Sequence, residues 1–228
     1  MNEPDLEERR HAYQYLTPHE VKFLDAAVDC LIPADESGPG AREAGVTVFI
    51  DRQLATGWGA HARQYRQGPW QEGTPQQGYQ LPLTPGEIYR EAIREIDSHC
   101  MRLFDAPFCF VERSRQEEIL RSLEAGSITL ESVPAKVFFE LLWANAQEGF
   151  FSDPMYGGNR GMIGWKMIGF PGVPSAAYSS HIQQHNVPYR VNPVSIQDIV
   201  DGKIKLDAEG LPVHSELPPE QVEPSCRH

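Results

Sequence analysis

Several features that would place a chain in a well-defined class are missing from this sequence. Its 228 residues include 20 lysines and arginines against 32 aspartates and glutamates, so the net charge is −12. This charge would repel a phosphate backbone, which argues against nucleic-acid binding. Long apolar runs are missing too, since none approaches the roughly 18 residues that cross a bilayer. We therefore expect no membrane span and no nucleic-acid partner.

Cysteine is scarce, and its spacing matches no metal or haem motif. The four cysteines, Cys30, Cys100, Cys109 and Cys226, form neither a C-x-x-C motif nor a C-x-x-C-H motif. We therefore predict no metal ligands in this chain. If a disulfide forms at all, we expect it between Cys100 and Cys109, because a turn at residues 105–107 would bring them together.

The sequence also lacks a self-sufficient reaction centre. The glycines between Gly157 and Gly161 do not match the P-loop pattern, and they follow a predicted helix where phosphate-binding loops follow a strand. No serine lies in a G-x-S-x-G elbow. We therefore predict that this chain holds no catalytic and no cofactor-binding residues.

Two alternatives stay open at this level. Glu148 and Asp153 could be the carboxylate pair of a free-standing carbohydrate-active enzyme, although Asp153 before Pro154 equally suits a turn. His181 and His185 have the i, i+4 spacing of zinc-binding helices. They lack the glutamate of H-E-x-x-H and an evident third ligand.

What the sequence does contain predicts a mainly α-helical fold of about five helices. Two helices begin with the same capping box, in which Thr17 or Thr84 is followed by proline and, three residues on, by glutamate. Ser132 is the predicted cap of the most apolar helix, which we expect to be central. Leu103 and Trp143 are assigned to inward faces. The predicted helices cover residues 18–32, 46–56, 85–104, 114–125 and 134–149.

Glycine and proline, at 19 residues each, indicate much irregular structure besides these helices. We expect a long ordered loop at 57–83 and a helical domain over residues 1–172. Residues 173–228 have little apolar periodicity, which predicts an extended tail that gains its order on a partner.

The last part of the predicted domain is expected to be a long glycine-rich loop segment, EGFFSDPMYGGNRGMIGWKMIGFPG, at residues 148–172. Its aromatic, methionine and arginine residues are types enriched at protein interfaces. We expect Asp153 to accept main-chain N–H groups of the turn at Pro154, Arg160 to tie loop carbonyls or a partner carboxylate, and the Trp165 ring to be buried with its N–H bonded. The candidate interface or structural-clasp residues are Phe151, Asp153, Tyr156, Asn159, Arg160, Trp165 and Lys166.

This segment and the helix before it resemble the hallmark of the gluconate 2-dehydrogenase subunit 3 family. Members carry a close relative of the helical stretch that begins at residue 138, then E-G-x-F-S-D-P-x-Y-G-G-N-R, and then G-W-x-x-[IL]-G-[FY]-P-G. The matching residues are 148–149, 151–154, 156–160, 164–165 and 169–172. The L-I-P at residues 31–33 and YRVNPVSIQDI at 189–199 also resemble the family. The resemblance therefore covers most of the chain.

The resemblance implies a small, non-catalytic subunit of a bacterial membrane-bound sugar, polyol or sugar-acid dehydrogenase. In such complexes, a large subunit of the glucose-methanol-choline class holds FAD, and a multihaem cytochrome c subunit passes electrons to quinones. The expected cofactors, FAD and haem c, therefore lie in partner subunits and none in this chain. The small subunit is expected to support maturation, stability and export of the FAD subunit.

The resemblance also implies a periplasmic location, at the inner membrane through the complex. Family members commonly carry a twin-arginine export signal. Here Arg9 and Arg10 are followed by neither an apolar core nor a small-residue cleavage site. We expect either that a signal has been trimmed or that export is directed elsewhere.

Overall fold

The computed structural model describes residues 12–62, 66–71, 73–173 and 191–206, together with residues 208, 213 and 215. This described part is mainly α-helical, with isolated β-bridges in place of strands. None of its helices combines the length and apolar character needed to cross a membrane. The α-helices are α1 (Pro18–Leu31), α2 (Val46–Leu54), α3 (Pro85–Phe104), α4 (Arg113–Ala125), α5 (Ala135–Phe151), α6 (Ile163–Ile168) and α8 (Ile196–Val200). The predicted helical fold is confirmed, and α6 and α8 are short helices beyond the expected five.

The starts of α1 and α3 are the predicted capping boxes. At α3, the Thr84 hydroxyl accepts from the Glu87 main-chain N–H, while the Glu87 carboxylate accepts from the Thr84 main-chain N–H at 2.8 Å. Hydrogen bonds from Thr84 lower the pKa of Glu87. The predicted cap of α5 is wrong: Pro134 precedes this helix without a side-chain cap, and the Ser132 N–H donates to Glu95 instead.

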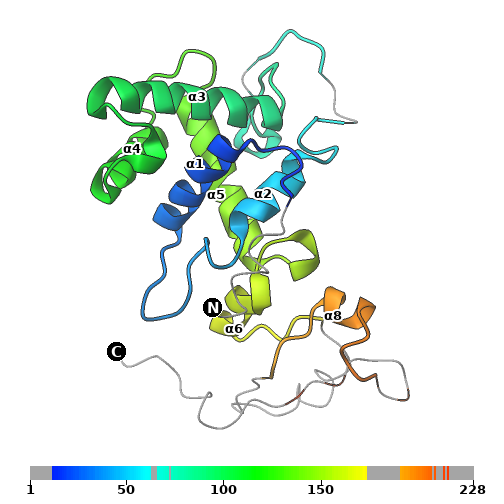
Figure 1. The fold of residues 1–228 in the computed structure, drawn as a ribbon. Helices are drawn as coiled ribbons and strands as arrows, with labels where there is room; N and C mark the ends of the chain where they lie inside the picture. Colours follow the sequence, from blue (N-terminus) through cyan, green and yellow to red (C-terminus); the bar gives the residue numbers. More distant parts are fainter. Residues whose placement is uncertain are drawn as a thin grey trace.

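Helix α5 is the central element, as predicted from its apolar sequence. It contacts α1, α2, α3, α4 and α6, and Figure 1 shows it running through the middle of the molecule beneath α3. The core around the N-terminal half of α5 is aromatic. The Phe138 ring meets the Tyr89 ring edge-on at 5.5 Å between centroids, and the Tyr89 hydroxyl donates to Asn145 at 2.8 Å. This bond satisfies a buried phenol in an otherwise apolar core.

Two side chains assigned to the core are exposed. Leu103 is 60% exposed because it lies in the last turn of α3, just before Asp105 turns the chain away in a left-handed conformation. Trp143 is 37% exposed and lines a groove of about 420 Å³ with residues of α1 and α4. Each lies within one turn of buried residues of the same helix, Cys100 and Leu142, so periodicity alone did not separate these two side chains from the core.

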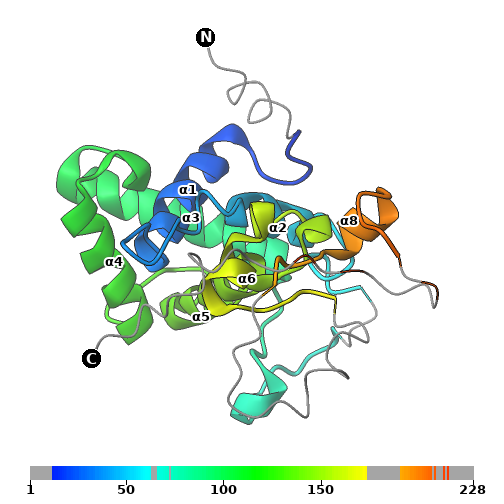
Figure 2. The same ribbon diagram turned by 90° about the horizontal axis from the view of Figure 1, so that it is seen from below.

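The long loop predicted at 57–83 is a loop in its described residues, apart from the short 3-10 turn η3 (Pro75–Gln77). Trp58 and Tyr79 pack against the core. Helices α6 and α8 lie on the side of the molecule opposite α3, and Figure 2, seen from below, shows both of them.

Candidate functional site

The glycine-rich segment (residues 148–172) contains more helix than expected. Helix α5 continues through its first residues to Phe151, and the turns η5 (Pro154–Tyr156) and η6 (Arg160–Met162) lead into α6. The expected long loop is therefore a folded-back hairpin of short helical pieces. Its main-chain groups are held by side chains because such short turns satisfy few of their own hydrogen bonds.

Asp153 holds two parts of the chain together. Its Oδ1 accepts from the Met155 N–H at 3.0 Å, which is the turn contact expected from the sequence. Its Oδ2 accepts from the Ile196 N–H at 2.7 Å, at the start of α8. The side chain is only 9% exposed. One buried carboxylate thus links the turn after α5 to a helix 43 positions further along the chain.

Asn159 and Trp165 hold the end of α5, where carbonyl groups have no partner within the helix. The fully buried Asn159 donates to the Ser152 carbonyl at 2.9 Å and accepts from the Gly164 N–H at 2.8 Å. Trp165 is 6% exposed and its Nε1 donates to the Phe151 carbonyl at 2.7 Å. The burial and hydrogen bond expected for Trp165 are both present, and the two side chains fix α6 against α5.

Glycines allow this close packing, for two different reasons. Gly157 and Gly161 have φ values of +101° and +63°, as expected for turn glycines. Gly158 and Gly164 instead allow close approach: a Cβ atom there would lie 2.1 Å from the Gly149 carbonyl oxygen and 2.2 Å from the Phe150 carbonyl oxygen. The segment therefore packs main chain against main chain on the last turns of α5.

We expected the Arg160 guanidinium to bind carbonyl groups of the segment, but in the structure the guanidinium of Arg52 does so. Arg52 on α2 donates to the Met155 carbonyl at 3.2 Å. Arg160 uses its main-chain N–H, which donates to Ala44 at 2.9 Å. No described residue accepts a hydrogen bond from the Arg160 side chain. Arg160, Lys166, Phe151 and Tyr156 are exposed, and their part in partner binding stays a prediction.

The tail was expected to lie along a partner, but part of it packs on its own chain. The Val194 N–H donates to the Pro171 carbonyl at 3.0 Å, and the Val173 N–H donates to the Val194 carbonyl at 2.8 Å. Val194 and Ser195 are buried, and Ser195 forms a capping box with Asp198 at the start of α8. Residues 191–200 therefore belong structurally with the glycine-rich segment.

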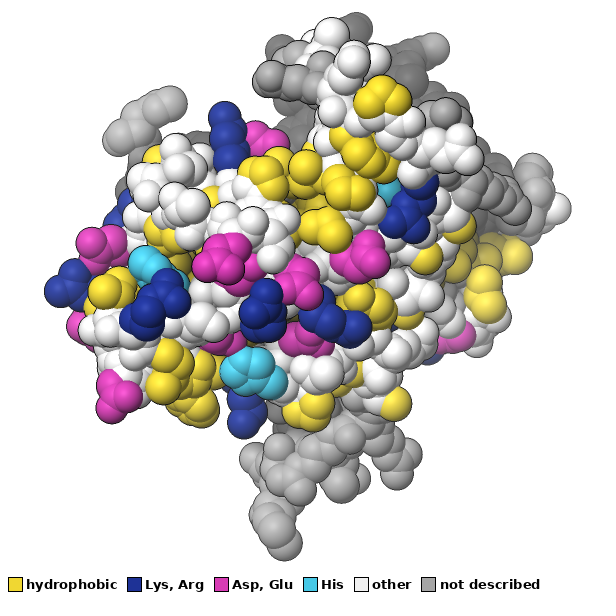
Figure 3. All heavy atoms as spheres, turned by 90° about the horizontal axis from the view of Figure 1, so that it is seen from above, with side chains coloured by type: hydrophobic (Ala, Val, Ile, Leu, Met, Phe, Trp, Pro, Cys, Tyr) yellow, Lys and Arg dark blue, Asp and Glu magenta, His cyan; other side chains and the backbone are white. Residues whose placement is uncertain are grey.

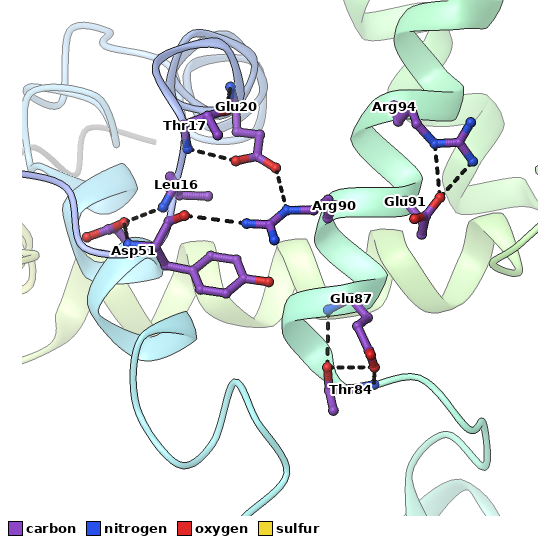
Figure 4. Close-up of polar contacts among 10 residues, drawn as sticks. Leu16, Thr17, Glu20, Asp51, Thr84, Glu87, Arg90, Glu91 and Arg94 are labelled. Atoms are coloured by element: carbon purple, nitrogen blue, oxygen red, sulfur yellow. Dashed lines mark hydrogen bonds and ion pairs between the residues drawn. The ribbon is translucent and has the colours of Figure 1, made fainter.

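Sequence reasoning missed a second carboxylate clamp, at Asp51 on α2. Asp51 is 2% exposed and accepts three main-chain N–H groups, from Gln14, Tyr15 and Leu16, at 2.8 to 2.9 Å. Figure 4 shows it beside the start of α1. The available signal was an aspartate near the apolar stripe of a predicted helix, where a charge needs partners.

A neighbouring ion pair secures the same region. The Arg90 Nε donates to the buried Glu20 at 3.2 Å, and its guanidinium carbon lies 4.6 Å from the centre of the Tyr15 ring. Glu20 also accepts from the Thr17 N–H, so the capping box of α1 is joined to α3 (Figure 4). The chain before α1 is therefore held by both α2 and α3.

The carboxylates considered for catalysis have structural partners. Both oxygens of Asp153 accept main-chain N–H groups, and the exposed Glu148 accepts from the Asn145 side chain at 3.1 Å. This arrangement suits a hydrogen-bond acceptor better than a nucleophile or proton carrier. His181 and His185 lie outside the described residues. Within the described ranges, no group of three His, Cys, Asp or Glu side chains is placed to hold a metal ion.

Cys100 and Cys109, the expected disulfide pair, are free thiols in the structure, as is Cys30. Cys100 is fully buried on the inner side of α3, whereas Cys109 is half-buried in the short 3-10 turn that follows this helix. Burial raises the pKa of Cys100 to about 12 and that of Cys30 to about 11, from an ordinary value of 9.0.

We expect slow alkylation of these thiols in the folded protein. A pKa near 11 instead of 9.0 lowers the thiolate fraction of Cys30 at pH 8 about 100-fold, and the thiolate is the reacting form. Intact mass after iodoacetamide treatment without reductant measures the labelling. In denaturant all four cysteines should be alkylated rapidly. A cysteine pair that resists alkylation in denaturant would instead reveal a disulfide.

Comparison with known protein families identifies a relationship. A family model described as gluconate 2-dehydrogenase subunit 3 matches residues 18–172, from the first turn of α1 to the end of the glycine-rich segment. No curated protein and no solved structure matches the chain. The matched range contains Asp51 and every candidate residue of the segment, while the main-chain donors at residues 14–16 that Asp51 binds lie just before it.

Proposed function

The chain belongs to the gluconate 2-dehydrogenase subunit 3 family, and from this membership we propose that it is the non-catalytic small subunit of a flavin-dependent, cytochrome-linked sugar or sugar-acid dehydrogenase. Its direct partner is a large FAD-containing subunit of the glucose-methanol-choline class. A multihaem cytochrome c subunit completes the complex. The small subunit supports maturation, stability and export of the FAD subunit, and the complex works in the periplasm at the inner membrane.

The observation that carries this proposal is the family match over residues 18–172. The geometry of the glycine-rich segment supports a non-catalytic role. Asp153, Asn159 and Trp165 are buried, and each makes a hydrogen bond to the main chain. Side chains used in this way build a rigid surface, whereas acid–base chemistry requires groups that can reach a substrate.

The proposal places all redox chemistry in the partner subunits. FAD and haem c have strong visible absorption, so their location can be measured directly. The purified full-length chain should show neither spectrum, and the complex recovered from the native host should show both. FAD bound to this chain alone in equal amount would contradict the proposal.

We expect Asp153→Asn to reduce the amount of assembled dehydrogenase while leaving turnover per flavin unchanged. The amide nitrogen of asparagine cannot accept the hydrogen bond that one of the two main-chain N–H groups now donates, and loss of a hydrogen bond to a charged group costs about 1.5 to 3 kcal/mol. Arg160→Ala should act in the same direction if this guanidinium reaches a partner carboxylate. Yield of complex, flavin content and turnover per flavin would be measured side by side.

Asp35→Asn is the matched control. Asp35 is exposed, and its carboxylate accepts one local main-chain N–H, from Ser37 at 2.7 Å. This variant should assemble like wild type. Normal assembly of Asp153→Asn with turnover per flavin down about a hundredfold would mean that the segment takes part in the chemistry, and that the proposed non-catalytic role is wrong.

A further inference from the structure

The glycine-rich segment and α8 expose an unusual number of large apolar side chains. The most prominent, at 39% to 73% exposed, are Phe151, Tyr156, Ile168, Phe170, Ile196 and Val200. We call this set the apolar face. Single exposed apolar residues are ordinary on protein surfaces, but a group of them on adjoining elements marks an interaction site.

The elements that carry the apolar face adjoin one another: α8 contacts η5, η5 contacts η6, and α6 contacts both η6 and α5. Helix α8 packs on η5, and Asp153 joins Ile196 to the turn that contains Tyr156. The Trp165 N–H donates to the Phe151 carbonyl, and the Trp165 ring meets Phe170 edge-on at 5.2 Å. Figure 2 shows α6 and α8 on the same side of the molecule. The face therefore spans parts of the chain far apart in sequence.

The buried bonds beneath the face hold it in place before any partner binds. Asp153 and Asn159 connect α8, the turns and α6 to the end of α5, and close glycine contacts leave no space between them. A preformed surface loses little conformational entropy on binding, so most of its apolar contact contributes to affinity.

Charge distinguishes this region from the rest of the chain. Residues 148–173 and 191–206 contain Glu148, Asp153, Asp198 and Asp201 against Arg160, Lys166, Lys203 and Lys205, so they are neutral in a chain of net charge −12. All the excess negative charge lies elsewhere. The face seen from above in Figure 3, on the side of α3, carries acidic and basic side chains interleaved with apolar ones.

The net charge of the whole chain also indicates what kind of protein covers the apolar face. Two copies of this chain would each bring a net charge of −12 to a shared interface, and long-range repulsion would oppose their association. A different protein with a weakly charged apolar surface meets no such opposition. A neutral apolar patch also gives little attraction to a nucleic acid or a small anion.

We infer that the apolar face is the surface by which this chain docks on the folded FAD-containing subunit, with Ile168 and Val200 among its contact residues. The inference rests on the proposed function, and adds to it the place of contact. It also assigns a role to residues 191–200: they complete the docking surface by packing on the segment, and Asp153 is the positioning residue that keeps α8 there.

The test compares two double variants of the full-length chain. Ile168→Glu with Val200→Glu places charge on the apolar face, at side chains that are 60% and 73% exposed. Leu103→Glu with Phe110→Glu is the control, at side chains that are 60% and 70% exposed on α3 and the turn after it. Tagged wild-type chain is first expressed in the native host, and the recovered flavoprotein is identified by its flavin spectrum and mass. The purified flavoprotein is then titrated with each variant.

We expect the apolar-face variant to bind the flavoprotein at least about 30-fold more weakly than wild type, because charges buried at an interface centre oppose association. The control should bind within about threefold of wild type. Equal binding by both double variants would overturn the inference while leaving the proposed function intact. If wild-type chain recovers no flavoprotein of this class, the proposed function itself is wrong.

Misfolding and self-association would also change the measured binding, and each has its own readout. Helical circular dichroism and thermal unfolding report whether each variant is folded, and Tyr156→Ser with Ile196→Ser offers a milder change on the same face that should also weaken binding. Sedimentation of the wild-type chain alone reports self-association. A wild-type dimer that the apolar-face variant disrupts would show that a second copy covers the face, and would overturn the inference.

Discussion

The Gly164→Ala variant is expected to be less stable than wild type by about 3 kcal/mol, which is a large part of the stability of a typical domain. The added Cβ atom would lie 2.2 Å from the Phe150 carbonyl oxygen and 3.1 Å from ring atoms of Phe150 and Phe151. A ring can move aside, but the carbonyl belongs to the last turn of α5. The variant can therefore form only if α6 shifts away from α5, which breaks the hydrogen bonds of Asn159 and Trp165.

Gly161→Ala is the matched control for this change. Gly161 has φ of +63°, and no atom lies within 4 Å of a Cβ built there. Alanine would therefore lower the free energy of unfolding only through its left-handed conformation, by about 1 kcal/mol. Denaturant unfolding of both variants, with near-ultraviolet circular dichroism to follow the packing of the aromatic side chains, separates the two effects. Equal stability of the two variants would mean that α6 is not packed on α5 as described.

Asp51→Ala should lower the free energy of unfolding by about 3 kcal/mol, since it removes the acceptor of three main-chain N–H groups from a buried position. The Gln14 and Tyr15 donors are near enough to the surface to find water after a local rearrangement, but the Leu16 N–H is buried with its side chain. We expect the chain before α1 to detach from α2 in this variant. Hydrogen exchange at residues 14–16 should become fast while the α5 core stays protected.

Asp35→Ala serves as the control here as well, because the Asp35 carboxylate accepts one hydrogen bond, from Ser37, within its own exposed turn. Its loss should change the free energy of unfolding by less than about 0.5 kcal/mol. Unchanged exchange at residues 14–16 in Asp51→Ala would contradict the clamp. The ion pair of Arg90 with Glu20 would then be the main support of this region.

Local sequence determined the helices and where most of them begin and end. The capping boxes at Thr17 and Thr84, and Gly126 beyond α4, act within one or two turns of the chain, so their effect can be read without knowledge of the fold. The same holds for the turn at Asp153, where proline and a local acceptor suffice. The hallmark motif in residues 138–172 likewise identified the family, which the match over residues 18–172 confirmed.

Tertiary structure decided every contact that joins distant residues. No local pattern states that Asp153 also binds the Ile196 N–H, that Arg52 takes the carbonyl expected for Arg160, or that Asp51 binds the chain before α1. A hydrogen-bonding side chain indicates only that it needs a partner. Which partner it finds depends on how the helices pack, and that packing is set by many weak apolar contacts summed over the core. The apolar face exists for the same reason, since α6 and α8 adjoin the turns after α5 only in the folded chain.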